Sequence, residues 1–142
     1  MDEQVNELLK TLKVEHRAFV DVAQALDIGK RTAHGVCGEW SPKDVVAHLV
    51  GWDASLKGFI VDIENFVPPY DVHGFNEQSV AARAEMGWAA VIGELKTNFA
   101  ELEVTLDTVT PEMRIYPRVV DWLPGRVADY QLHTGQLEKW VS

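Results

Sequence analysis

The stretch Trp40-Ser-Pro-Lys-Asp-Val-Val-Ala-His48-Leu-Val-Gly-Trp52-Asp53 begins with a strong helix-start signal and continues as an apolar helix. Ser41 suits the cap position, Pro42 the first helical position, and Asp44 the acid that reaches back to the cap. Apolar residues then recur every three or four positions, which predicts a helix to about Glu64. His48 falls within this stripe, so we expect its imidazole on the buried face.

Three more helical segments surround this one. Apolar residues with helical spacing predict a first helix from about Asp2 to Leu26. A third stretch, capped by Asn76, runs over residues 77–107 with a possible break near Gly87. The last helix is expected from Gly125 or Arg126 to about Val141. No segment alternates as a strand does, so the fold class is all-α, a helical bundle.

The connections are marked by glycine and proline. Residues 27–40 and 65–75 read as loops, and Thr110-Pro111-Glu112 starts a short helical turn. Residues 116–125 contain two prolines and a glycine, which predicts irregular structure there.

Composition limits the class of protein. A length of 142 residues suits one domain, residues 1–142, with a single hydrophobic core. The net charge of -9 disfavours nucleic acid as a partner. Cys37 is the only cysteine, and the polar, acidic N-terminus is unlike a signal peptide. No apolar run is long enough for a membrane span, so we expect a cytoplasmic protein.

The last predicted helix carries a pair of side chains with metal-binding chemistry. Asp129 and His133 are four residues apart, so they share one helical face. His48 could add a third ligand and leave an open position for water or substrate, as in catalytic metal sites. The alternative is that Asp129 simply accepts a hydrogen bond from His133.

Other polar residues have plainer interpretations. His16 lies near the first apolar stripe and is read as a partly buried histidine rather than a ligand. His34 and Cys37, three apart in a glycine-rich loop, are a weak metal signal. Tyr130 is read first as a packing residue with its hydroxyl at the rim, and with Asp53 as a possible proton donor or acceptor.

The segment from Trp40 to Asp53 closely resembles the second-helix signature of the DinB-like (YfiT-like) family, especially its ClbS/DfsB branch. The resemblance extends to Asn76, to the stretch 106–112, and to the closing pattern from His133 to Trp140. It implies an up-down four-helix bundle with a three-histidine metal site at one end. His48 and His133 match the first and third histidines, and Asp129 stands at the position of the second.

The resemblance implies a divalent metal ion, with zinc or nickel as the first candidates, held by His48, Asp129 and His133. It implies a metal-dependent hydrolase or thiol-dependent transferase that acts on reactive or xenobiotic small molecules, with a homodimer as the expected assembly. No catalytic residue is assigned. The alternative is a non-enzymatic protein that binds or sequesters a small molecule beside a degenerate metal site. Four residues are expected to contact the small molecule: Trp40, Trp52, Asp53 and Tyr130. In the non-enzymatic alternative the pocket is lined by Trp40, Trp52 and Tyr130.

Overall fold

Six helices account for most of the chain. The computed structural model describes residues 2–141, so the two end residues of the predicted domain lie outside the described part. The helices are α1 (Glu3–Gln24), α2 (Ile28–Arg31), α3 (Pro42–Val61), α4 (Val72–Ala82), α5 (Trp88–Leu106) and α6 (Tyr116–Trp140). Within residues 2–141 there is no strand, which confirms the all-α class. None of the described helices is long and apolar enough to cross a membrane.

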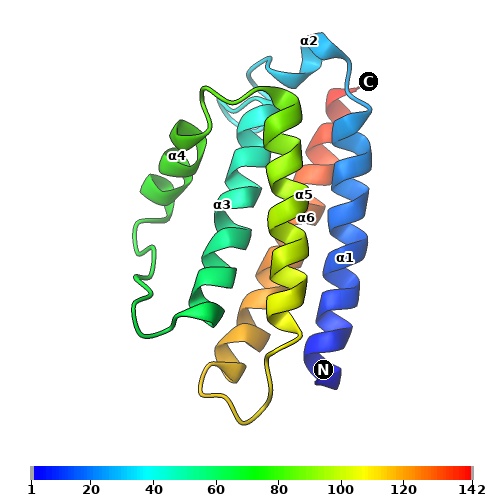
Figure 1. The fold of residues 1–142 in the computed structure, drawn as a ribbon. Helices are drawn as coiled ribbons and strands as arrows, with labels where there is room; N and C mark the ends of the chain where they lie inside the picture. Colours follow the sequence, from blue (N-terminus) through cyan, green and yellow to red (C-terminus); the bar gives the residue numbers. More distant parts are fainter. Residues whose placement is uncertain (1, 142) are drawn as a thin grey trace.

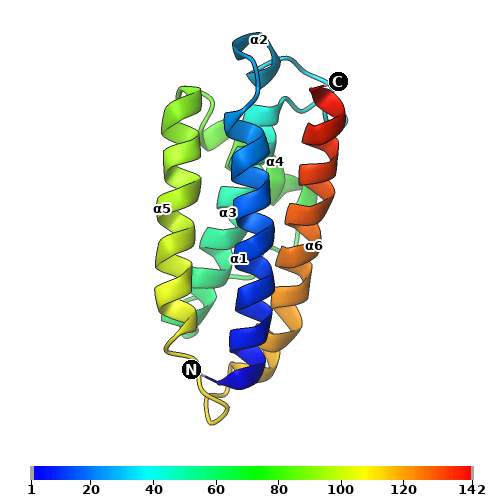
Figure 2. The same ribbon diagram turned by 90° about the vertical axis from the view of Figure 1, so that its right-hand side faces the viewer.

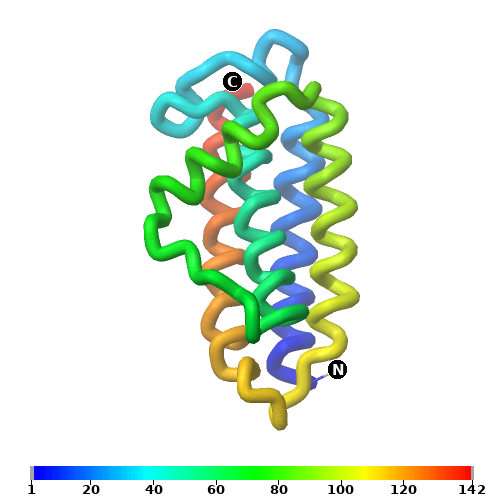
Figure 3. The backbone as a smooth tube through the Cα atoms, turned by 60° about the vertical axis from the view of Figure 1, so that its left-hand side comes forward, coloured from blue at the N-terminus to red at the C-terminus, as the bar shows by residue number. Residues whose placement is uncertain are grey.

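The four long helices lie side by side around one hydrophobic core (Figures 1 and 2). α1 packs against α6, and α3 packs against both α5 and α6, while α1 also touches α5. α4 lies outside this group, against α3 (Figure 3). The core is built from stripes with three- and four-residue spacing, such as Leu9, Leu12, Phe19 and Ala23 on α1.

The direction of the chain differs from a simple up-down arrangement. α1 and α6 run one way, and α3 and α5 both run the other way (Figure 1). Residues 62–87, which include α4, carry the chain back along the outside of α3 before α5 begins (Figure 3). This connection is long enough to span a 20-residue helix of about 30 Å, so consecutive long helices need not be antiparallel.

The predicted start of α3 is confirmed. The Asp44 backbone N–H donates to Ser41 Oγ at 3.2 Å, and the Ser41 backbone N–H donates to Asp44 Oδ2 at 3.0 Å. Pro42 occupies the first turn. This reciprocal capping fixes the first residue of α3 and thereby the rotation at which His48 enters the interior.

The predicted start of the third helical stretch was wrong, whereas its predicted break near Gly87 is confirmed. Asp71, not Asn76, caps α4, and its side chain accepts from the Gly74 backbone N–H at 2.9 Å. Asn76 lies inside α4, and the break falls over residues 83–87, between α4 and α5. Residues 27–40, expected to be a plain loop, contain the short helix α2, and residues 110–113 form a hydrogen-bonded turn.

The prediction that residues 116–125 are irregular was also wrong. α6 begins at Tyr116 and continues through Pro124 to Trp140. Pro117 lies in the first turn, where its missing N–H costs nothing. Pro124 breaks the helical hydrogen-bond ladder, but neighbouring core residues such as Val119 and Leu123 are fully buried. The stripe therefore continues in steps of three and four on both sides of the proline, and tertiary packing outweighs the local signal.

A glycine sets the distance between α3 and α4. A Cβ atom on Gly51 would lie 2.2 Å from Ser79 Oγ and 2.8 Å from Ser79 Cβ, closer than atoms can approach. Any side chain larger than hydrogen would force α4 away from α3 at this point. Gly51 thus permits the close contact that places the other residues of α4, including Asn76, over α3.

We predict that Gly51→Ala destabilises the protein although alanine favours a helix interior by up to about 1 kcal/mol. The free energy of unfolding, measured with urea, should fall, because Ser79 and α4 must move. Gly58→Ala in the same helix is the matched control, since its Cβ would meet nothing within 4 Å, and it should be neutral or stabilising. Equal effects of the two substitutions would contradict the close contact.

Candidate metal centre

Three potential ligands from two helices meet in the interior. His48 comes from α3, and Asp129 and His133 come from α6. Asp129 Oδ1 lies 3.0 Å from His48 Nε2 and 3.1 Å from His133 Nε2. The three ligand atoms lie within 4.8 Å of one another, and the part of the chain that the structure describes holds no other such group of three. The predicted convergence of these residues is therefore present.

The distance from the carboxylate to each imidazole is close to the ligand spacing around one divalent ion. With metal–ligand bonds of about 2.0–2.1 Å, two ligands of a tetrahedral ion lie about 3.3 Å apart. The two imidazole-to-carboxylate distances are only slightly shorter than that. The histidine rings are 5.1 Å apart at their centres, and both Nε2 atoms lie close to Asp129 Oδ1. Two histidines and one carboxylate form an accepted zinc donor set.

The orientation of His48 is fixed from α4. The Trp52 indole N–H donates to Asn76 Oδ1 at 2.7 Å, which identifies that atom as the amide oxygen. The same oxygen lies 3.0 Å from His48 Nδ1, so Nδ1 must carry the proton. His48 Nε2 is then the atom that faces Asp129: with its lone pair it can bind a metal ion, and with a proton it donates to Asp129 Oδ1.

His133 has a similar arrangement. Its Nδ1 lies 2.6 Å from Gln136 Oε1, three residues further along α6. With Nδ1 donating to that oxygen, His133 Nε2 likewise faces Asp129 Oδ1, where it can bind a metal ion through its lone pair or donate a proton to the carboxylate. Two lone pairs beside a carboxylate repel unless a proton or a cation lies between them. The donor set is therefore suited to a cation.

The second oxygen of Asp129 is held by a buried arginine. Arg126 Nη1 donates to Asp129 Oδ2 at 2.6 Å, and Arg126 Nε donates to Asp53 Oδ1 at 2.9 Å. The Tyr130 hydroxyl donates to the other Asp53 oxygen at 2.5 Å. Asp53 and Tyr130 are 0% exposed and Arg126 is 3% exposed, so this network forms part of the interior.

The network also explains the electrostatics of the carboxylates. Burial raises the pKa of Asp129, but hydrogen bonds from His133 and His48 and the charge of Arg126 outweigh it and bring the pKa below its ordinary value. Burial raises the pKa of Asp53, and the Arg126 guanidinium opposes this effect. Asp129 is thus kept ionised, as a metal ligand must be.

His16 forms the far end of the network. Its Nδ1 lies 3.1 Å from the Tyr130 hydroxyl oxygen and acts as the donor, because that hydroxyl proton is directed at Asp53. Its ring stacks on Phe99 at 3.8 Å and borders a cavity of about 390 Å³ between α1 and α5. Burial, with a smaller effect of Lys96, lowers the pKa of His16 to about 4. His16 is a partly buried interior histidine, as predicted.

The four residues expected to contact a small molecule lie in different environments. Trp40 is partly exposed, with its ring centre 5.1 Å from that of His48, and Trp52 is partly buried against Phe75. Asp53 and Tyr130 have no exposed surface, so the expected position of the Tyr130 hydroxyl at a rim was wrong. The sequence spacing placed Tyr130 on the correct helix but did not show which face of that helix points to the interior.

Several functional residues were missed from the sequence. Arg126 continues the buried stripe of α6 at positions 119, 123, 126, 130, 133 and 137, which was a usable signal. The roles of Asn76 and Gln136 depend on contacts that spacing alone does not indicate. His34 and Cys37 join no metal group; His34 Nδ1 lies 2.8 Å from the backbone oxygen of Glu39.

Comparison with known proteins identifies the family. Residues 12–141 match the family model described as the mycothiol maleylpyruvate isomerase N-terminal domain. This family lies within the DinB/YfiT-like helical superfamily, which confirms the predicted resemblance at that level and gives no support for the ClbS/DfsB branch. No curated protein and no solved structure matches the chain.

The environment of His16 predicts a pH-dependent stability. A free histidine has a pKa near 6.5, and the folded protein lowers it to about 4. The unfolded chain therefore gains a proton below pH 6.5 that the folded protein does not bind. The free energy of unfolding decreases as the pH is lowered from about 6.5 to about 4. Between pH 7 and pH 5 this group should cost about 2 kcal/mol of unfolding free energy.

Urea unfolding of the wild type and of His16→Gln at pH 7 and pH 5 measures the contribution of His16 to the free energy of unfolding. The glutamine amide can still donate to Tyr130, so the variant should fold and lose about 2 kcal/mol less between pH 7 and pH 5. An NMR titration should show the His16 ring neutral at pH 5. A midpoint near 6.5 would contradict the burial argument.

Proposed function

The chain belongs to the mycothiol maleylpyruvate isomerase N-terminal domain family, and from this membership we propose that it is a metal-dependent enzyme that uses a small thiol as co-substrate. The observation that carries the proposal is the convergence of His48, Asp129 and His133 on one point inside the helices. The proposed substrate is a small electrophilic molecule, in keeping with the isomerase named in the family description.

Three residues of this chain would hold the ion. His48 and His133 would bind through Nε2 and Asp129 through Oδ1, and zinc or nickel suits this mixture of imidazole and carboxylate. When bound, such an ion polarises a substrate or lowers the pKa of a coordinated thiol or water. Asn76 and Gln136 keep the imidazoles in the ligating tautomer, which supports the proposal independently of the ligand distances.

The rim beside His48 supplies the proposed substrate contacts. Trp40 stands next to the metal centre at the end of the 32–40 connection, and its ring offers an apolar wall. Trp52 borders the site through its hydrogen bond to Asn76. Asp53 and Tyr130 act from the interior by supporting Arg126 rather than by contact with the small molecule. The predicted homodimer stays a prediction.

We predict that protein purified without an affinity tag binds one zinc or nickel ion per chain. Isothermal titration calorimetry and elemental analysis should give this stoichiometry for the wild type. His48→Ala, Asp129→Ala and His133→Ala should each abolish binding or weaken it strongly, because each removes one of three ligands. His34→Ala, a histidine outside the group, is the matched control. No binding by the wild type under any loading condition would refute the proposal.

The activity test uses mycothiol with maleylpyruvate and with simple electrophiles. The metal-loaded wild type should isomerise or conjugate at least one of them, and the reaction should require both metal and thiol. If an electrophile is consumed in the presence of metal but without thiol, the protein is a hydrolase and the proposed use of a thiol is wrong. Binding of the small molecules with no turnover would support the non-enzymatic alternative.

A further inference from the structure

We infer that Arg126, anchored by Asp53, is a positioning residue that restricts Asp129 to a single-oxygen metal ligand and so keeps a coordination position open. The inference rests on the proposed function, since it concerns the same ion. It adds a role for Arg126 and Asp53, two buried residues outside the donor set.

The geometry of the carboxylate is the first observation. Asp129 presents Oδ1 to both imidazoles, at 3.0 and 3.1 Å, and gives Oδ2 to Arg126 Nη1 at 2.6 Å. A carboxylate bound in this way cannot swing its second oxygen onto the same ion without losing a charge-assisted hydrogen bond. The protein then supplies three ligand atoms, the number typical of catalytic rather than structural zinc.

The immobility of the arginine is the second observation. The guanidinium is planar and uses separate N–H groups on its two acids, Nε for Asp53 and Nη1 for Asp129. Its third contact is Nη2 to the Leu49 backbone oxygen, at 3.5 Å, in α3. Asp53 is in turn fixed by the Tyr130 hydroxyl. The guanidinium therefore links α3 to α6 in one orientation.

The energetics favour a functional reason for this arrangement. A buried ion pair is often no more stabilising than apolar residues of similar size, because both charges lose their hydration. Asp53 and Arg126 are 0% and 3% exposed, so stability alone does not account for them. Holding a ligand in place does account for them, since groups that orient metal ligands typically contribute about 10- to 100-fold in metal affinity.

The test is Arg126→Lys, which keeps the positive charge but lacks the two-pronged donor. We expect cobalt(II) bound to the wild type to show the intense visible absorption of a low-coordinate site. In the variant Asp129 can bind through both oxygens, so the absorption should weaken, and the zinc Kd should rise about 10- to 100-fold. Both readouts are independent of enzymatic activity.

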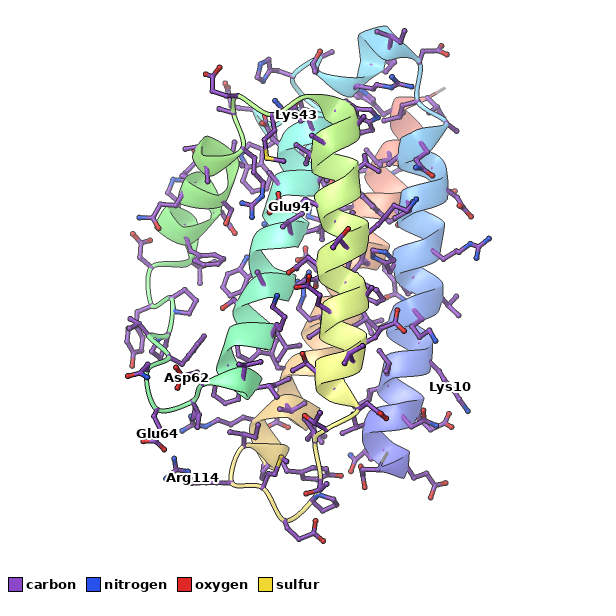
Figure 4. All side chains as sticks on the ribbon, viewed as in Figure 1. Lys10, Lys43, Asp62, Glu64, Glu94 and Arg114 are labelled. Atoms are coloured by element: carbon purple, nitrogen blue, oxygen red, sulfur yellow. The ribbon has the colours of Figure 1, made fainter. Side chains whose placement is uncertain are left out.

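Arg83→Lys is the matched control. Arg83 makes a two-pronged contact with Glu94, Nε to Oε1 at 2.8 Å and Nη2 to Oε2 at 3.2 Å. Glu94 lies on α5 (Figure 4), and neither residue is a member of the metal group. The control should leave the cobalt spectrum and the zinc Kd unchanged, which separates the metal effect from general loss of an arginine.

A second variant keeps the inference testable if Arg126→Lys does not fold. The double substitution Asp53→Asn with Arg126→Met removes both buried charges, and the asparagine oxygen can still accept the Tyr130 hydroxyl. Because Asp53 no longer carries a charge, this variant should lose only the Arg126–Asp129 contact and show the same weakened cobalt absorption. Unfolding measured by urea confirms that it is folded.

Two results would overturn the inference and leave the proposed function intact. One is a folded variant, single or double, with the wild-type cobalt spectrum and a zinc Kd within about twofold of the wild type. The other is a wild-type cobalt spectrum that is already weak, as for a higher-coordinate ion. Absence of metal binding by the wild type would instead refute the proposed function itself.

Discussion

The site depends on one buried carboxylate that is shared by three positively polarised partners. Asp129 faces His48 from α3 and His133 and Arg126 from its own helix, all within 3.1 Å. A carboxylate in this position would be costly without those partners, because burial raises its pKa. Side chains this short must approach to within a few ångströms, so the relative rotation and height of α3 and α6 are fixed by this cluster.

Features remote from the Asp129 carboxylate also help to place its partner His48. The reciprocal cap at Ser41 sets where α3 begins, and the bare backbone of Gly51 lets α4 approach close enough for Asn76 to reach His48. The hydrogen bond from Trp52 to Asn76 then selects the amide orientation and, through it, the imidazole tautomer. The helix start, the close contact at Gly51 and the hydrogen bonds of Asn76 together determine the position and protonation of His48, and thus what its Nε2 atom presents to Asp129.

The sequence predicted what depends on local spacing and missed what depends on tertiary contacts. The cap of α3, the all-α class and the meeting of positions 48, 129 and 133 were confirmed, because helical periodicity and the family resemblance encode them. The start of α6 was missed because Pro117 and Pro124 are local breakers, whereas the fully buried stripe around them is a property of the assembled core. The chain reversal by residues 62–87 was missed for a similar reason, since a loop and a short helix indicate length but not direction.

The division between interior and rim bears on specificity. Every contact that orients the candidate ligands comes from buried or half-buried side chains on α3, α4 and α6, which leave little freedom to vary. Trp40, at the end of the 32–40 connection, is partly exposed and lies beside His48, so its substitution costs less packing energy. A family built on this plan can keep one metal chemistry while the rim changes the small molecule it accepts. On the proposed function, the aromatic surface of Trp40, next to His48, is the part of this site in which a change of small-molecule preference is expected.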